Sequence, residues 1–267
     1  MTKDQGAEWI VLGAGSVLPR PGYGNAGYAL FDPASESLTV FDCGAGTWRA
    51  LANAGFGLER ITRIVLSHFH LDHCLDLFSL ALARMNPDFE GGELELVGPV
   101  GTQKFIERAG RALGSVARGF DGVKYLEVAP GSRIASRSLP EYRISTVGTH
   151  HNKDSLAWRV DLPSGGSVCY SGDSGEERSV AELARKTSLF VCECSFPAER
   201  ATPNHLTPAG AGRLAQHAEC QRLLLTHFYP SMEPERAARE AAELFSGTIE
   251  IARDGRRFPI VVQDEAR

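Results

Sequence analysis

The chain of 267 residues has no run of eighteen apolar residues, and its first six residues contain no apolar segment of the kind that opens a secretory signal. These absences argue against a transmembrane helix and against export, so we expect a cytoplasmic protein that does not enter a membrane. No repeat, linker or low-complexity segment divides the sequence. Since 43% hydrophobic content can build one large core, we expect a single domain over residues 1–267.

Paired cysteines are also lacking. The six cysteines are scattered along the chain, and none belongs to a C-x-x-C motif. At this density, in a chain of this size, they are typical of reduced and mostly buried thiols in a cytosolic protein rather than of a disulfide framework.

An excess of positive charge is missing as well. The net charge is −5 and the pI is about 5.9. General nucleic-acid-binding proteins are usually basic, so nucleic acid is not the partner that this composition favours. A local basic patch remains compatible with it, and a small-molecule substrate is the expected partner.

What the sequence does contain is a cluster of histidines of the form H-x-H-x-D-H that begins at His68. With Ser67 before it, the cluster directly follows residues 61–66, which have the composition of a strand. Side chains alternate along a strand, so His68 and His70 point the same way if the extended geometry continues. Asp72 and His73 lie on the turn into an apolar stretch typical of a helix, and they can aim at a second point nearby. This pattern predicts two adjacent metal ions. Imidazole and carboxylate ligands suit zinc, with iron or manganese as alternatives.

Three more polar residues stand where predicted strands end: His151, Asp173 and His227. Loops on one edge of a pair of packed sheets can bring such residues to a single site. Strands rich in β-branched residues occur in both halves of the chain and alternate with helices. We therefore expect an α/β (α+β) fold in four layers, an αβ/βα sandwich of two mixed sheets with helices outside.

Taken together, these motifs resemble the ribonuclease Z-like branch of the metallo-β-lactamase superfamily. The similar stretches occur in the family's order and cover nearly the whole chain: Leu-Gly-x-Gly-Ser, Phe-Asp-Cys-Gly, Leu-Ser-His-x-His-x-Asp-His, Tyr-Ser-Gly-Asp-Ser and Leu-Thr-His-Phe. The resemblance implies a first ion held by His68, His70 and His151. It implies a second held by Asp72, His73 and His227, with Asp173 bridging both. It further implies that a water between the ions becomes a bridging hydroxide and attacks the substrate. Asp72 can orient that hydroxide as well as bind metal.

His151 has a neighbour, His150, that offers the same chemistry. We prefer His151 as the ligand because Ser155 and Trp158 then stand at the family's offsets. His217 falls within a predicted helix, and we interpret it as structural.

The resemblance also suggests two catalytic residues besides the ligands. Ribonuclease Z-like proteins have a histidine that approaches the scissile phosphate and a glutamate that supports it. His205 and Glu193 match these places, and His205 is then a candidate general acid or oxyanion donor. An ordinary loop histidine and a structural glutamate are the alternatives. Asp42 has two interpretations as well: a partner of a ligating histidine, or a cap on the helix that follows it.

One feature of ribonuclease Z is missing. Its long arm, which grips transfer RNA, is inserted between the third histidine motif and the bridging aspartate, where this chain has only 21 residues, from His151 to Asp173. The expected function is therefore a phosphodiesterase acting on small or cyclic phosphodiesters. A lactonase or β-lactamase-type hydrolase of C–O or C–N bonds, and a tRNA 3′-processing endoribonuclease, remain as alternatives, and a non-enzymatic metal protein or a redox di-iron centre is less favoured. Specificity is expected in loops such as residues 114–122, and Phe120, Phe196 and Pro197 are candidates for lining either a pocket or a homodimer contact.

Overall fold

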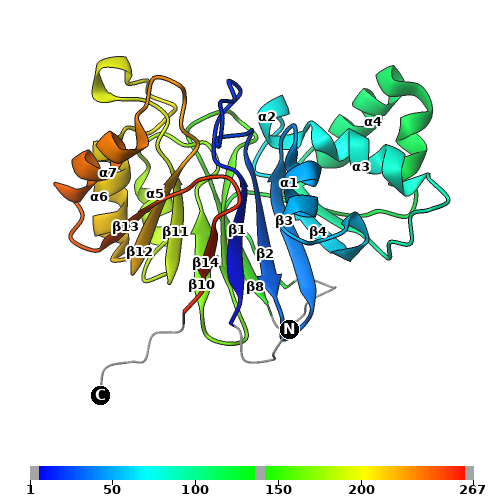
Figure 1. Ribbon diagram of the computed structural model, residues 1–267, viewed down its shortest axis with the longest axis horizontal. Helices are drawn as coiled ribbons and strands as arrows, with labels where there is room; N and C mark the ends of the chain where they lie inside the picture. Colours follow the sequence, from blue (N-terminus) through cyan, green and yellow to red (C-terminus); the bar gives the residue numbers. More distant parts are fainter. Residues whose placement is uncertain (1–5, 136–141, 262–267) are drawn as a thin grey trace.

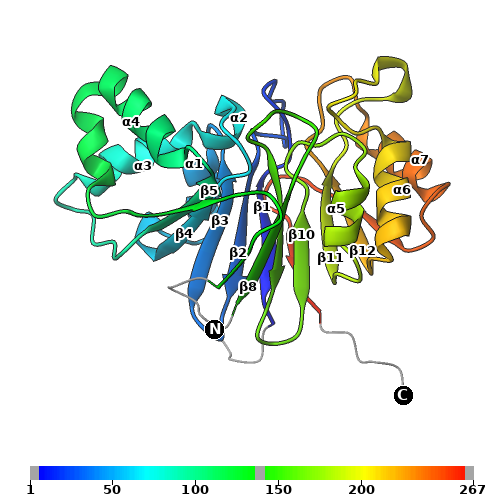
Figure 2. The same ribbon diagram turned by 180° about the vertical axis from the view of Figure 1, so that it is seen from behind.

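Two seven-stranded mixed sheets pack face to face in the computed structural model, and helices cover their outer faces (Figures 1 and 2). The structure describes residues 6–135 and 142–261. The predicted four-layer sandwich is thereby confirmed. The first sheet has the order β14-β1-β2-β3-β4-β5-β6 and the second β13-β12-β11-β10-β9-β8-β7.

The strands of the first sheet are β1 (Glu8–Gly13), β2 (Gly27–Asp32), β3 (Ser37–Cys43), β4 (Ile61–Val65), β5 (Glu95–Pro99), β6 (Lys124–Val128) and β14 (Arg257–Pro259). Those of the second are β7 (Arg133–Ala135), β8 (Arg143–Gly148), β9 (Leu156–Asp161), β10 (Ser167–Tyr170), β11 (Leu189–Glu193), β12 (Arg222–Thr226) and β13 (Thr248–Ile251). The helices are α1 (Thr47–Asn53), α2 (Leu71–Cys74), α3 (Asp76–Arg84), α4 (Thr102–Leu113), α5 (Arg178–Leu183), α6 (Pro208–Ala218) and α7 (Pro234–Ala242). Short 3₁₀ segments are η1 (Leu58–Arg60), η2 (Gly114–Phe120) and η3 (Ala198–Arg200).

Each sheet is antiparallel in one half and parallel in the other. The pairs from β3 to β6 are parallel, as are those from β10 to β13. Parallel neighbours need a crossover, usually a helix, and α1 to α4 and α5 to α7 supply these connections. The parallel strands of each sheet therefore end at one edge, where the loops into the helices begin.

The core has two parts because the central strands are buried on both faces. On β1, Trp9 and Val11 face the layer between the sheets, and Ile10 and Leu12 face the helices over the first sheet. Trp9 meets the ring of Tyr170 from the second sheet at a centroid distance of 6.1 Å. Strands buried on both faces leave little room for polar side chains, which explains why β1 is apolar from Trp9 to Leu12.

Several boundaries differ from the sequence-based prediction. The helix expected after the histidine cluster is interrupted, with α2 ending at Cys74 and α3 beginning at Asp76. Residues 114–120, expected as an exposed loop, form η2 and pack on α3. Phe120 is buried in the core of the first sheet, so its predicted role at a pocket or dimer contact was wrong. The helix α6 begins at Pro208, and the side chain of Thr207 caps it. Among the described helices, none has the length and apolar character needed to cross a bilayer.

Candidate metal centre

The histidine cluster lies at the end of β4, where the chain enters α2. His68 is fully buried, and the ring of His70 lies 4.6 Å from it between centroids. The side chain of Phe69 turns the other way and stacks on Phe105 of α4 at 4.8 Å. The period-two alternation expected from the strand therefore continues through the cluster, and it directs both histidines to one side.

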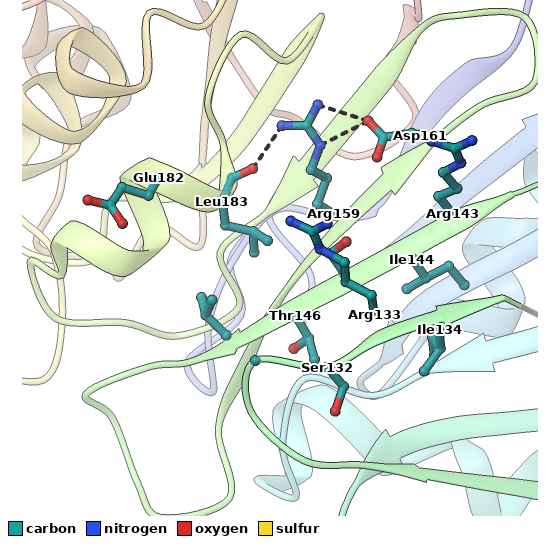
Figure 3. Close-up of a pocket in the computed structure, with 13 residues that line it drawn as sticks. Ser132, Arg133, Ile134, Arg143, Ile144, Thr146, Arg159, Asp161, Glu182 and Leu183 are labelled. Carbon is teal, nitrogen blue, oxygen red and sulfur yellow. Dashed lines mark hydrogen bonds and ion pairs between the residues drawn. The ribbon is translucent and has the colours of Figure 1, made fainter.

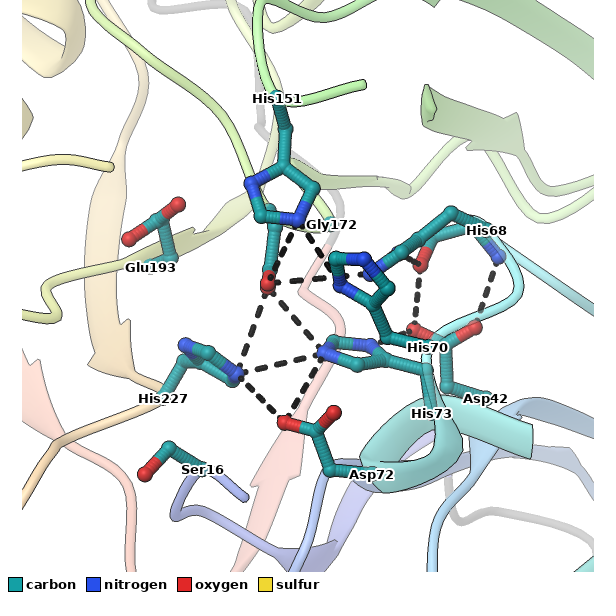
Figure 4. Close-up of polar contacts among 12 residues, drawn as sticks. Ser16, Asp42, His68, His70, Asp72, His73, His151, Gly172, Glu193 and His227 are labelled. Atoms are coloured by element: carbon teal, nitrogen blue, oxygen red, sulfur yellow. Dashed lines mark hydrogen bonds and ion pairs between the residues drawn. The ribbon is translucent and has the colours of Figure 1, made fainter. Parts of the chain in front are cut away.

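A first group of candidate ligands combines loops of both sheets. Its members have ligand atoms within 4.8 Å of one another: His68, His70, His151 and Asp173. The first two follow β4, His151 follows β8, and Asp173 follows β10. The Nε2 atom of His151 lies 3.1 Å from Nδ1 of His70, and the two rings, labelled in Figure 4, are nearly perpendicular with an interplanar angle of 80°.

A second group lies beside the first and consists of Asp72, His73 and His227. The Nε2 atoms of His73 and His227 are 3.2 Å apart, and Oδ2 of Asp72 is 3.6 Å from Nε2 of His227. Figure 4 shows these three side chains converging from α2 and from the end of β12. His227 has a left-handed backbone with φ 58°, a conformation that is uncommon outside glycine.

Asp173 stands between the groups and turns one oxygen to each. Oδ2 lies 3.5 Å from Nε2 of His151 and 3.8 Å from Nε2 of His68. Oδ1 lies 3.2 Å from Nε2 of His73 and 3.4 Å from Nε2 of His227. A carboxylate in this position can contact two ions at once.

Metal ions fit this arrangement on two grounds. Nε2 of His68 and Oδ1 of Asp173 are fully buried and have no hydrogen-bond partner, which is costly unless another group satisfies them. The facing nitrogens of His73 and His227, and of His70 and His151, are 3.2 and 3.1 Å apart. Zinc–nitrogen bonds of about 2.0–2.1 Å in a tetrahedral ion place two nitrogens roughly 3.3 Å apart.

The hydrogen bonds on the outer side of the rings assign the tautomers. Nδ1 of His151 contacts the carbonyl oxygen of Asn204 at 3.1 Å, so this nitrogen must carry the proton. Nδ1 of His227 contacts Oγ of Ser195 at 3.0 Å, and that hydroxyl donates its own proton to Glu193. In both rings Nε2 is then left as the acceptor that faces the site. Such outer partners are the usual companions of metal-ligating histidines.

Protonation states agree with metal binding for the two candidate ligands whose buried atoms have no hydrogen-bond partner, His68 and Asp173. Burial lowers the pKa of His68 well below its usual value, which keeps the ring neutral. Burial opposes ionisation of Asp173, but the nearby His227 and His73 rings hold the pKa of its carboxyl well below the usual range. A neutral imidazole and an ionised carboxylate are the forms that bind divalent ions.

Asp42 is a buried partner of the cluster rather than a helix cap. It accepts hydrogen bonds of 2.7 Å from Nδ1 of His73, from the amide and hydroxyl of Ser67, and from the hydroxyl of Tyr170. The first turn of α1 is instead capped by Asp76, whose Oδ2 accepts from the amides of residues 46 and 48. The capping interpretation of Asp42 was therefore wrong.

His205 and Glu193 pair beside the two groups. Nδ1 of His205 lies 3.1 and 3.2 Å from the oxygens of Glu193, which is fully buried. A ring nitrogen of His205 lies within 4.8 Å of ligand atoms of Asp173 and His227. Burial opposes the charged ring, but the hydrogen bond to Glu193 and its charge raise the pKa of His205. Glu193 also accepts from Oγ of Ser195 at 2.5 Å, so its position is fixed by more than His205.

Two other histidines lie outside both groups. The side chain of His150 is 69% exposed and pairs with Glu177 at 3.6 Å, whereas the side chain of the adjacent His151 is 4% exposed. His217 is exposed on the surface of α6.

The family profile described as the β-lactamase superfamily domain matches residues 38–228, which include all the candidate ligands. The chain belongs to the metallo-β-lactamase superfamily. It is 32% identical over 260 residues to the uncharacterized protein ML1173 of Mycobacterium leprae, covering 94% of this chain and 87% of that protein. It is 29% identical over 305 residues to a ribonuclease Z of Nocardia farcinica, covering 95% of this chain and 97% of that enzyme. The metallo-β-lactamase fold protein YhfI of Bacillus subtilis superposes with a TM-score of 0.80 at 23% identity, covering 94% and 99% of the two chains.

Sequence reasoning missed the hydrogen-bond partners of this superfamily site. Ser67, Tyr170 and Ser195 hold Asp42, His227 and Glu193 in place. Ser67 and Tyr170 lie inside or beside the recognised motifs, but serine and tyrosine hydroxyls carry no spacing signal of their own. Only the three-dimensional fold reveals what these hydroxyls reach.

A hollow of about 610 Å³ on the second sheet contains none of the candidate ligands. It lies beside β7 to β9 and α5, and Figure 3 shows Arg133, Arg143 and Arg159 around it. Arg159 is tied to Asp161 at 2.8 Å and to the carbonyl oxygen of Leu183 at 3.0 Å. This arginine therefore fastens α5 to the sheet, and we assign no chemistry to the hollow.

Proposed function

We propose that this protein hydrolyses small or cyclic phosphodiesters with the help of two divalent metal ions. The pairing of His205 with the buried Glu193 beside the two ligand groups carries this proposal. Seven other side chains already suffice for two ions, so His205 is free to act on the substrate. Cleavage of a diester builds negative charge on phosphate and leaving-group oxygens, where a fixed imidazole can donate a hydrogen bond or a proton.

The first ion would be held by His68, His70 and His151, and the second by Asp72, His73 and His227, with Asp173 shared. Bound zinc, manganese or iron would supply Lewis-acid activation of water and of the phosphoryl group near neutral pH. The chain itself would hold the histidine rings and the attacking water in position. Asp42, Ser195 and the carbonyl of Asn204 fix three of the rings, and Asp72 can orient the attacking water.

His205 would act on the leaving group. As the water oxygen forms its bond to phosphorus, the bond to the leaving oxygen breaks, and that oxygen takes up a proton. Glu193 keeps Nδ1 of His205 protonated and the ring oriented through hydrogen bonds of 3.1 and 3.2 Å. The Nε2 side of the ring is then the one available to the leaving group.

A small substrate is supported by what lies between His151 and Asp173. These residues form β9 and β10, joined by a tight turn and paired antiparallel in the second sheet. No segment of this connection is left over for an arm that grips a large RNA. The match to the Nocardia ribonuclease Z runs over 305 residues, more than the 267 of this chain, so that enzyme contains residues without a counterpart here.

The proposal is tested by comparing three substrates on one zinc- or manganese-loaded preparation: bis(p-nitrophenyl) phosphate, the lactone dihydrocoumarin and a precursor tRNA. We expect kcat/KM for the diester to exceed that for the lactone at least a hundredfold. We also expect His205→Ala to lower kcat for the diester by about 10² to 10⁴. His217→Ala, an exposed histidine on α6, is the matched control and should retain full activity.

Faster hydrolysis of the lactone would overturn the proposal in favour of acyl chemistry. Efficient cleavage of the precursor tRNA at its 3′ side would favour the second candidate, tRNA processing, which the 29% identity to a ribonuclease Z supports.

A further inference from the structure

A second hollow, of about 330 Å³, lies next to the candidate metal centre and has no role in the function proposed above. Its walls come from three parts of the chain: the loop after β4, the first half of α4, and the loop after β8. The side chains that matter are Phe69, Lys104, Phe105, Arg108, Lys153 and Asp154. The volume is in the range of sites for small ligands.

The hollow and the metal centre share the same two loops. Phe69 stands between the candidate ligands His68 and His70, with its ring turned to the opposite side. Lys153 follows His151 by two residues, so their Cα atoms are at most about 7 Å apart. The loops that carry candidate ligands of the metal centre thus also form walls of this hollow.

Positive charge dominates the lining. Lys104, Arg108 and Lys153 are exposed, and none of them forms an ion pair within the described part of the chain. One carboxylate, Asp154, faces them in the lining. Three unpaired cations around one hollow attract anions, because a concave wall of one sign focuses the field. The first residues of α4 add the partial positive charge of a helix N-terminus.

The positive charge of this hollow contrasts with the negative net charge of the whole protein. The net charge of the protein is −5, and some of the exposed arginines elsewhere pair with carboxylates, such as Arg213 with Glu176 at 2.6 Å and Arg236 with Glu199 at 2.8 Å. Lys104, Arg108 and Lys153 have no such partner among the described residues, so this group of cations keeps its positive charge in a protein whose net charge is negative.

Two aromatic rings, Phe69 and Phe105, form part of the lining. Phe69 and Phe105 stack nearly parallel, with an interplanar angle of 14°. Phe78 of α3 packs against Phe105 at 6.0 Å, which ties the pair to the helical layer. Arg108 lies one turn after Lys104 on α4, so both cations project from the same side of that helix.

We infer that this hollow binds a second phosphate of the substrate, so that the preferred substrates are phosphodiesters that carry a further phosphate group. This inference rests on the proposed function, because it assumes that the reacting diester sits at the metal centre. The cations would recognise the distal phosphate, and the stacked phenyl rings would support the apolar part of the group that links the two phosphates.

The test uses two nucleotide esters that differ only in the distal phosphate: thymidine 5′-(p-nitrophenyl phosphate) and its 3′-phosphorylated form. We expect the zinc-loaded protein to prefer the 3′-phosphorylated ester at least tenfold in kcat/KM. The double variant Arg108→Gln, Lys153→Gln should lose that preference. Arg111→Gln removes the same charge from the same helix without lining the hollow, and should keep the preference. Arg108→Lys, which retains the charge, should keep most of it.

Binding of unreactive ligands separates this inference from the proposed function. By titration calorimetry, thymidine 3′,5′-bisphosphate should bind the zinc-loaded protein at least tenfold more tightly than thymidine 5′-monophosphate, about 1.4 kcal/mol. The double variant should lose this difference. If neither ester is hydrolysed but the difference and its loss are observed, the phosphodiesterase proposal fails while the phosphate site stands. Equal affinities in the wild type, or an equal loss in Arg111→Gln, would overturn the phosphate site itself.

Discussion

Asp42 and His73 form a completely buried pair, in which Nδ1 of the ring donates to Oδ2 of the carboxylate at 2.7 Å. The hydrogen bond leaves Nε2 of His73 directed at Asp173 and His227. Asp42 itself has a left-handed backbone with φ 52°. Non-glycine residues rarely adopt this conformation, and at functional sites such strain commonly serves positioning.

This relationship predicts the effect of Asp42→Asn. The amide has the same size, but it cannot accept from Ser67, Tyr170 and His73 with the strength of a carboxylate. We expect zinc affinity to fall by about 10- to 100-fold, as for other outer partners of metal-binding histidines. Competition with a chromogenic chelator measures it. Unaltered affinity in a folded Asp42→Asn protein would mean that the pair is structural only.

The pair of Glu193 and His205 predicts a non-additive effect on turnover. If Glu193 acts through the ring, Glu193→Gln should lower kcat for a diester, and adding it to His205→Ala should cost little more. Steady-state kinetics on the two single variants and the double variant measure the coupling, with circular dichroism to check folding. Strictly additive losses would indicate that Glu193 serves the fold through Ser195 and the amides of Ser174 and Leu206.

Gly119 in η2 gives a prediction about stability. A Cβ at this position would lie 1.8 Å from the carbonyl oxygen of Ala81 in α3, and backbone cannot yield as a side chain can. Gly119→Ala should therefore lower the free energy of unfolding by about 1–3 kcal/mol, the usual range for overpacking. Gly92→Ala is the control, since no atom lies within 4 Å of its added Cβ. Urea unfolding of both variants measures the two free energies of unfolding. Equal midpoint urea concentrations for Gly119→Ala and Gly92→Ala would contradict the close packing of η2 on α3.

The ligand groups could be anticipated because their signal is local. H-x-H-x-D-H follows a strand, and His151, Asp173 and His227 follow others, so strand ends on one edge were enough to expect convergence. The two-sheet sandwich followed from the alternation of strands and helices in both halves. These inferences depend on chain order and on the two-residue period, which a sequence displays directly.

The features that could not be predicted from the sequence depend on contacts between distant segments. Phe120 was expected at the surface because residues 114–122 were predicted to form an exposed loop, yet the approach of η2 to α3 buries it. Asp42 could equally have capped α1 until the structure brought Tyr170 of the other sheet to its carboxylate. The cation-lined hollow at α4 joins three segments, and no single stretch of the sequence contains its pattern.

Asp173 predicts the result of metal removal, because it is the one candidate ligand that contacts both groups through separate oxygens. Asp173→Ala should lose both ions and the hydrolytic activity together, and His68→Ala should also lose activity. A ligand bound at a thousand times its Kd stabilises the native state by about 4 kcal/mol. For a chain of this size each kcal/mol shifts Tm by roughly 2–4 °C. A chelator should therefore lower the Tm of the wild type by about 10 °C and leave that of Asp173→Ala nearly unchanged. Elemental analysis by plasma mass spectrometry gives the metal content. Full activity in a metal-free Asp173→Ala protein would refute the two-ion scheme, because no other carboxylate among the described residues lies between the two groups of histidines.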